Sequence, residues 1–420
     1  MKLNYKRTIL IGMAFLGILA FWQLYDVIVP LILENTFKLD KTVTGFVMSI
    51  DNILALILLP FFGALSDKTS TPIGKRTPFI VVGTIVAVIG LLIMPYATNK
   101  ANFTLFNIAL AVVLLATAFY RSPAIALMPD LTPKALRSKA NAIINLVGTL
   151  GAIMTLGLIK LLVPKVDMPN YTPVFGAVGA IMLISMIVLK LTINENKIAK
   201  EVTGHDEEEI VKNVGQKLPP EVQKSFLFLL ASIFFWFAAY NGITTAFSRY
   251  AMHMWGMKEG DVAMALMIAT VVAVLSYIPS GASATKIGRK KSIIIGICLV
   301  SITYTMGIFL KEYSTLTYIS FAIMGIGWAF INVNSLPMVV EMSKIGDIGK
   351  YTGTYYTASM SAQIMTPIFS GFLMQKFGYQ ILFPYALVFS ILSFITMMNV
   401  HHGDSEAAYA DPLEVFDVED

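Results

Sequence analysis

Three charged side chains occur inside long apolar runs, where a charge costs free energy unless a cavity or a partner solvates it. Asp26 lies in the first run, Asp51 in the second and Arg121 in the fourth. A carboxylate that faces a membrane cavity can bind a proton and release it when it becomes hydrated or paired. Asp26 and Asp51 are therefore candidates for proton coupling. The alternative is a structural network in which either carboxylate bonds to Asn or Tyr, or pairs with Arg121.

Amides and aromatic rings occur in the same kind of run. Gln23 precedes Asp26 by three residues, so the two share a helix face. Aromatic rings can stack on the apolar face of a ligand, and amides and carboxylates can bond to its hydroxyl groups. The alternative for these amides and rings is a lipid-facing belt with hydrogen bonds between helices. The substrate-cavity candidates are Gln23, Asp26, Asn52, Arg121, Tyr240, Asn241, Trp328, Asn332, Tyr355 and Gln363.

The composition requires lipid around the chain. Of its 420 residues, 56% are hydrophobic and only 14% are charged, which is more apolar surface than a soluble domain of this length can bury. Lipid requires each segment to satisfy its own backbone hydrogen bonds, so the runs are expected to be helices. Hydropathy predicts twelve crossings, at residues 8–33, 43–65, 79–97, 104–128, 140–162, 172–192, 225–249, 261–284, 292–310, 316–340, 352–375 and 380–399.

The twelve crossings divide six and six around a polar segment. The prediction is an all-α membrane protein with two pseudo-symmetric six-helix bundles, at residues 1–193 and 225–400. Residues 194–224 are expected to form a solvated linker with one or two surface helices, and residues 401–420 an acidic tail. Lys and Arg lie mainly in the loops on the same side of the membrane as the N-terminus. We therefore expect a multi-pass protein of the inner cell membrane with both termini in the cytoplasm.

A polar loop recurs in the two halves, between neighbouring apolar runs. The first copy is Gly63-Ala-Leu-Ser-Asp67, continuing to Gly74-Lys75-Arg76, and the second is 281–290. Carboxylates also end the fourth and tenth crossings. A carboxylate beside a basic loop can latch one conformation, or it can anchor its helix at the water boundary. The cytoplasmic gate candidates are Asp67, Lys75, Arg76, Asp130, Arg137 and Glu341.

The first copy of this loop resembles the signature loop of the major facilitator superfamily, and that resemblance extends over the whole chain. Its longer form, 66–79, together with Tyr120-Arg-Ser-Pro-Ala124 and Met128-Pro-Asp130, resembles the sucrose-transporter-like group and the glycoside–pentoside–hexuronide symporters. The resemblance implies two six-helix bundles around a central cavity, with a substrate bound near mid-membrane and transport by rocking of the halves. The second copy has Thr285 where Asp67 falls, so we do not expect the same salt-bridge latch there.

The residues favour protons over sodium as a coupling ion. Melibiose-type sodium symporters carry a carboxylate directly before the proline that precedes the signature loop, whereas here Leu59 precedes Pro60. A sodium site there would have no hard oxygen ligands from side chains. The four histidines show no metal-ligand spacing and no nucleophile–base pair, so we expect no metal, no other cofactor and no enzymatic activity.

We therefore expect a secondary transporter of a sugar or glycoside, driven by proton symport. Its expected partners are the small-molecule substrate and the lipid bilayer, with no nucleic acid, and the expected state is a monomer. The alternatives within transport are an uncoupled carrier and proton-driven efflux of a drug or metabolite. An alternative of another class is a transport-dead sensor or scaffold on the same fold.

Overall fold

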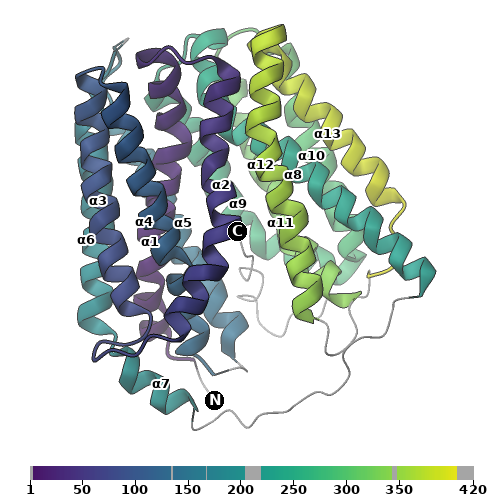
Figure 1. Cartoon of the computed structure of the whole chain (residues 1–420). Coiled ribbons are helices and arrows are strands. Elements are labelled where there is room, and N and C mark those ends of the chain that lie inside the picture. The colour runs from purple at the N-terminus through teal and green to yellow at the C-terminus, as the bar shows by residue number, and fades with distance from the viewer. Residues whose placement is uncertain (1–2, 134–135, 167, 204–218, 343–347, 404–420) are drawn as a thin grey trace.

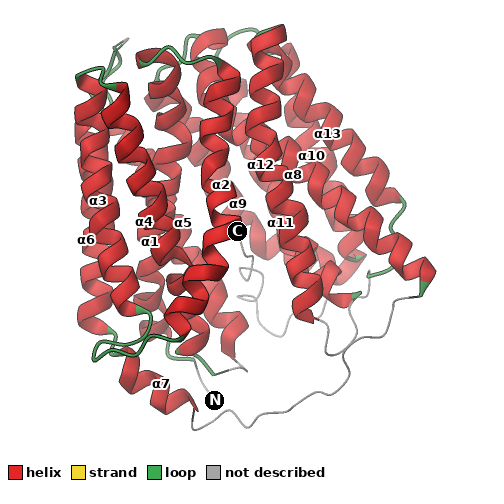
Figure 2. Cartoon of the chain, in the orientation of Figure 1, coloured by secondary structure: helices red, strands yellow, loops and turns green. Residues whose placement is uncertain are grey.

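The computed structural model describes residues 3–133, 136–166, 168–203, 219–342 and 348–403, and its regular structure in these ranges is helical (Figure 2). The elements are α1 (Tyr5–Leu31), η1 (Ile32–Thr36), α2 (Lys41–Asp67), α3 (Thr77–Asn99), α4 (Phe103–Asp130), α5 (Arg137–Leu162), α6 (Thr172–Thr192), α7 (Glu195–Thr203), α8 (Pro220–Trp255), α9 (Glu259–Ile287), α10 (Arg289–Phe309), α11 (Thr315–Glu341), α12 (Ile348–Phe377), η3 (Tyr379–Ile381) and α13 (Leu382–Met398).

Local sequence signals set where the helices begin and end. The Asp40 side chain accepts a hydrogen bond from the Val43 amide at 2.8 Å and begins α2, and Asn102 does the same for α4. Such side-chain acceptors satisfy amides that a helix start leaves unpaired. Gly256 ends α8 at a φ of 61°, a left-handed conformation that glycine adopts without a steric penalty. These signals separate apolar runs that would otherwise continue.

Within the described ranges, eleven helices are long and apolar enough to cross a membrane. The expected crossing at 352–375 falls in α12, which has 30 residues but is not among the eleven. Its first half is rich in Thr, Ser and Tyr, and these residues lower its hydropathy. Large apolar side chains remain on the outside of the molecule, with Leu161 80% exposed and Phe309 76% exposed. Such a surface requires lipid around it.

Helix contacts repeat in the two halves (Figure 1). In the first half α1 packs on α5 and α6, α3 on α4 and α6, and α2 on α4. In the second half α8 packs on α12 and α13, α10 on α11 and α13, and α9 on α11. Adding seven to each helix number of the first set gives the second set, so α1 corresponds to α8 and α6 to α13. The predicted pair of pseudo-symmetric halves is thereby confirmed.

The same symmetry governs the contacts between the halves. Helix α2 packs on α12, and α5 packs on α9. Since α9 is the counterpart of α2 and α12 is the counterpart of α5, the symmetry converts one of these contacts into the other. Helix α1 packs on α8, its own counterpart. Four helices and the α1–α8 pair therefore surround the axis between the halves, where a transporter of this architecture binds its substrate.

The expected linker contributes a helix to the structure. Helix α7 lies at the end of the bundle that carries the loop 68–76, drawn at the bottom of Figure 1. We call this the loop end and the opposite end the far end. Residues 204–218 of the expected linker and 404–420 of the expected tail lie outside the described residues.

Candidate functional site

A cavity of about 300 Å³ lies between the two halves. It is lined from α1, α2, α4 and α5 on one side and from α8, α9, α11 and α12 on the other. Its volume is at the lower limit of ordinary ligand pockets, which suits a small molecule of one or two rings. The structure brings together most of the sequence candidates here, namely Gln23, Asp26, Asp51, Asn52, Arg121, Tyr240, Asn241, Trp328 and Gln363.

Helical periodicity explains why these side chains converge. On α1 the lining residues are Leu19, Trp22, Gln23 and Asp26, with spacings of three, one and three. Residues 237, 240, 241, 244 and 245 of α8 follow the same spacing. Side chains three and four residues apart lie on one helix face, so a single stripe of each helix forms a wall of the cavity.

The charged groups of the described lining all come from the first half. Asp51 accepts a hydrogen bond from Asn52 Nδ2 at 3.1 Å. The guanidinium carbon of Arg121 lies 5.5 Å from the centre of the Trp22 ring, within reach of a cation–π interaction. With Asp26 the lining holds two carboxyls and one guanidinium, so one bound proton balances their charge. Carboxyls in such a setting can bind and release a proton.

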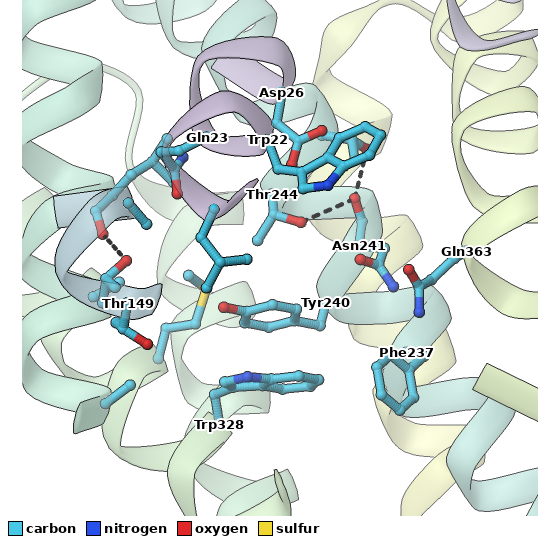
Figure 3. Close-up of a pocket in the computed structure, with 18 of the residues that line it drawn as sticks. Trp22, Gln23, Asp26, Thr149, Phe237, Tyr240, Asn241, Thr244, Trp328 and Gln363 are labelled. Carbon is cyan, nitrogen blue, oxygen red and sulfur yellow. Dashed lines mark hydrogen bonds between the residues drawn. The ribbon is translucent and has the colours of Figure 1, made fainter. Parts of the chain in front are cut away.

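The second half contributes rings and amides. The rings of Tyr240 and Trp328 are stacked, with centroids 3.7 Å apart and planes 10° apart. The rings of Phe237 and Trp328 are nearly perpendicular, with centroids 5.4 Å apart. Figure 3 shows these rings on one side of the space, Asn241 and Gln363 beside them, and Asp26 on the opposite side. A flat aromatic wall beside amides suits a molecule with one apolar face and hydroxyl groups.

Two sequence candidates lie elsewhere. Asn332 is 3% exposed, one helical turn beyond Trp328, and is not part of the lining. Tyr355 is also buried, and its hydroxyl lies 3.1 Å from Ser335 Oγ, inside the second half. The reasoning from sequence also missed lining residues, among them Trp22 and Thr244. Each is three or four residues from a candidate that it did choose, Asp26 or Asn241, so helical spacing could have found them.

Arg76 organises the loop end of the first half. Its Nε donates to Asp130 at 2.8 Å, and its other guanidinium nitrogens contact Asp67 and Ser66. Lys75 Nζ lies 3.1 Å from Asp130 as well. Burial alone would lower the pKa of Arg76, but the hydrogen bonds and charges of Asp130 and Asp67 outweigh burial and raise the pKa above its usual value. Four predicted gate residues of this half, Asp67, Lys75, Arg76 and Asp130, therefore form one network.

Glu195 of α7 holds the same loop from below, which the sequence did not predict. Its carboxylate accepts from the amides of Lys75, Arg76 and Thr77 at 2.8, 2.9 and 2.9 Å. It also accepts from the Thr77 hydroxyl at 2.7 Å, and only 2% of the residue is exposed. A carboxylate at the N-terminus of α3 pairs with unpaired amides and with the positive end of the helix dipole.

The second half keeps a reduced form of this network. Arg289 forms an ion pair with Glu341, as Arg76 does with Asp130. The expectation that this half lacks the same latch holds for Asp67 and Ser66, whose counterparts are Thr285 and Ala284, but the arginine–carboxylate pair is kept. The remaining gate candidate, Arg137, begins α5, and its side chain lies outside the described residues.

Polar contacts join the two halves at the far end. Glu34 of η1 pairs with Arg249 of α8 at 2.7 Å and accepts from the Tyr379 hydroxyl at 2.6 Å. Asp261 of α9 pairs with Lys160 of α5 and, at 3.1 Å, with Lys165. These three ion pairs join the first half to the second at this end. Charged groups thus link α1–η1 to α8 and α5 to α9 beyond the far end of the cavity.

Comparison with known proteins decides the family. The family described as MFS/sugar transport protein matches residues 10–348. The chain belongs to this family. It is accordingly a multi-pass membrane protein of the major facilitator superfamily, and the family and the fold are those of membrane transporters.

Individual relatives of this MFS protein are distant. Multidrug resistance protein 2 of Bacillus subtilis (strain 168) is 24% identical over 314 residues, covering 71% of this chain and 72% of that protein. Sucrose transport protein SUC3 of Arabidopsis thaliana is 27% identical over 139 residues, only 29% of this chain and 23% of that protein.

Solved structures share the fold of the MFS protein. A crystal structure of the nucleoside transporter NupG has a TM-score of 0.70 at 16% identity, covering 94% of this chain and 100% of that chain. A bacterial homologue of the iron transporter ferroportin, in an inward-facing state, has a TM-score of 0.68 at 13% identity and covers 94% and 99%.

Proposed function

We propose that the protein is a proton-coupled symporter of a small sugar or glycoside. The observation that carries this proposal is the division of the cavity wall: a stacked Tyr240–Trp328 surface with amides faces two carboxyls and Arg121. The rings and amides suit the two faces of a sugar, and the carboxyls supply groups that bind and release a proton. The family match and the sucrose-transporter relative are consistent with that substrate class.

The proposed cycle uses the two ends of the molecule. The far-end contacts, Glu34–Arg249 above all, would close the cavity on one side while substrate and proton leave on the other. Rocking of the halves about the cavity would then break these contacts and open the far end. The loop end carries Lys75, Arg76, Arg289 and their neighbours, so the positive-inside rule assigns it to the cytoplasm of the cell membrane.

Proton-driven efflux of an organic cation is the second candidate. It is favoured by the relative named Multidrug resistance protein 2, which matches over a greater length than the sucrose carrier. Two carboxyls and aromatic rings would also suit a cation. Arg121 in the same wall opposes it, because a bound cation would face a fixed positive charge.

Uptake into proteoliposomes separates these candidates. The full-length protein would be assayed with radiolabelled glucose, xylose, sucrose, maltose and lactose, and with tetraphenylphosphonium as an organic cation. An acid-outside gradient should drive accumulation of at least one sugar, and a protonophore should abolish that accumulation. Empty liposomes give the background. Movement of the cation with no movement of any sugar would overturn the proposal in favour of efflux.

A further inference from the structure

Two N–H groups in the cavity wall are buried without a partner. Among the described residues, neither Trp22 Nε1 nor Asn241 Nδ2 has a hydrogen-bond acceptor, although both are shielded from water. Both residues line the cavity, and they come from different halves, α1 and α8. A buried donor left unpaired costs free energy, so native structures almost always satisfy such groups. At a cavity wall, a ligand can supply the missing acceptors.

Neighbouring rings hold the Trp22 donor in place, and the nearest hydroxyl on α8 does not bond to the Asn241 amide. The Trp22 ring meets the Phe21 ring at 4.9 Å and the edge of Tyr25 at 5.4 Å. On α8, the hydroxyl of Thr245 donates to the backbone oxygen of Asn241 at 2.6 Å, so it is not directed to the side-chain amide. Figure 3 shows the Trp22 indole and the Asn241 amide near one another in this view of the cavity wall.

We propose that Trp22 Nε1 and Asn241 Nδ2 each donate a hydrogen bond to a different oxygen of one neutral, hydroxylated substrate. The proposal rests on sugar transport as the function and names the residues that set its specificity. An indole nitrogen only donates, and the amide nitrogen does the same. Two donors need two acceptor oxygens, which every saccharide has and tetraphenylphosphonium lacks. Meanwhile the apolar face of the sugar stacks on the face of Tyr240 turned away from Trp328.

This bridge would connect the substrate to the far end. Trp22 and Glu34 lie along one continuous helical segment, α1 and η1, and Asn241 and Arg249 lie on α8. Asn241 and Arg249 are eight residues apart, or about 12 Å along the helix. A substrate held by both donors therefore links the same two elements that the Glu34–Arg249 pair links.

Deoxy sugars test each donor separately. The labelled sugar is the fastest-transported one of the panel above. Its unlabelled parent form and monodeoxy derivatives would compete with it for uptake, which gives the apparent affinity of each. The measurement would be made on the wild type, Trp22→Phe and Asn241→Leu. In the wild type, removing the oxygen that faces one donor should weaken binding about tenfold. Trp22→Phe should bind the parent sugar about tenfold more weakly than the wild type does. It should bind the deoxy sugar that lacks the oxygen facing Trp22 with the same affinity as the wild type. Asn241→Leu should do the same for a different deoxy sugar.

Trp236→Phe is the matched control. It removes another buried indole N–H that has no acceptor among the described residues, but Trp236 does not line the cavity. Its sugar discrimination should equal that of the wild type. If Trp22→Phe and Asn241→Leu weaken the parent and every deoxy sugar alike, or leave discrimination unchanged, the inference is wrong while sugar transport stands. Absence of transport for every sugar would overturn both.

Monofluoro sugars keep the test decisive if a variant does not fold. Fluorine in place of a hydroxyl can accept a hydrogen bond but cannot donate one. At two positions, the wild type should therefore bind the fluoro sugar better than the matching deoxy sugar. Equal losses for fluoro and deoxy sugars at every position would contradict a pair of protein donors.

Discussion

Glu34 and Arg249 form a buried ion pair between the two halves, with Oε1 and Nη1 2.7 Å apart and the two side chains 6% and 1% exposed. Glu34 lies in the π-helical turn η1, which continues α1, and it also accepts from the Tyr379 hydroxyl. Removing one partner of a buried pair leaves an uncompensated charge, which costs about 3–5 kcal/mol. This contact is therefore the main polar link that opening of the far end must break.

Neutralising Glu34 should open the far end. In Glu34→Gln the closed state loses the pair, so the cavity should be reached more often from the far side. The measurement is the labelling rate of a cysteine at Thr244, in a Cys298→Ser background, by an impermeant maleimide applied from that side. Lys165→Gln is the control, because Asp261 keeps its pair with Lys160. Equal labelling rates in Glu34→Gln and the wild type would show that the pair does not hold this end closed.

Glu195 should stabilise the whole first half. Glu195→Gln keeps one acceptor oxygen but presents an amide donor to the Thr77 N–H, so at least one bond of this carboxylate is lost. We expect a loss of about 2 kcal/mol in unfolding free energy, seen as a lower Tm in detergent. Glu201→Gln should have almost no effect, because its pair with Arg7 is long, at 3.5 Å, and exposed. Equal Tm losses in the two variants would contradict this role.

Hydropathy and the repeated loop were sufficient to predict the architecture from the sequence. Apolar runs long enough to span lipid have few alternatives to helices, and Arg76 with Asp67 marks the family. The sequence did not reveal Glu34–Arg249, because both residues lie at the boundaries of predicted crossings, where charge is ordinary. Glu195 was hidden in a polar segment whose composition is that of a linker.

Part of the candidate site could be predicted from the sequence, because its residues are charged groups in apolar runs or repeat with helical spacing. Charge inside an apolar run identified Asp26 and Arg121, and the structure brings both to the cavity wall. Spacing alone cannot say which face of a helix meets the cavity and which meets another helix of the same half. Asn332 and Tyr355 therefore looked suitable, yet the packing of α11 and α12 buries them within the second half.

The stacked rings should contribute to sugar affinity. Trp328→Leu removes the ring that supports Tyr240 at 3.7 Å, so the aromatic wall loses its fixed plane. Apparent affinity for the transported sugar should weaken about three- to tenfold, measured by competition for uptake. Phe61→Leu is the control, since Phe61 is 60% exposed on the outer surface. An unchanged affinity in Trp328→Leu would show that the stacked rings do not contribute to sugar binding.

The two carboxyls of the cavity should separate binding from coupling. Asp26→Asn and Asp51→Asn each remove a group that binds a proton while keeping its shape. At least one variant should lose accumulation driven by a pH gradient yet retain sugar exchange across membranes without a gradient. Measuring both fluxes on the same vesicles distinguishes this from a folding defect, in which both would fall. Intact gradient-driven accumulation in both variants would clear both residues of coupling.

Tyr171 gives the far end a defined pH dependence. Its hydroxyl donates to Glu259 Oε1 at 3.1 Å, and burial, followed by the charge and hydrogen bond of Glu259, raises the pKa of Tyr171 above its usual value. The neutral Tyr171 hydroxyl contributes to the free energy of unfolding. Because its folded pKa exceeds the unfolded value of about 10, this stabilisation is complete below about pH 10. It is lost as the pH rises further, by up to about 1.4 kcal/mol per pH unit. The stability difference between wild type and Tyr171→Phe should shrink above pH 10 in detergent unfolding, and a difference that grows would contradict it.

Sugar-induced proton movement is the most direct test of the central claim. Proteoliposomes in weak buffer, with a pH dye outside and no imposed gradient, would receive the sugar that the uptake panel selects. Proton symport predicts that the outside becomes alkaline as sugar enters, and that a protonophore removes the signal. The Asp26→Asn and Asp51→Asn variants should reduce it. Entry of the sugar with no change in external pH would contradict proton symport and leave an uncoupled carrier.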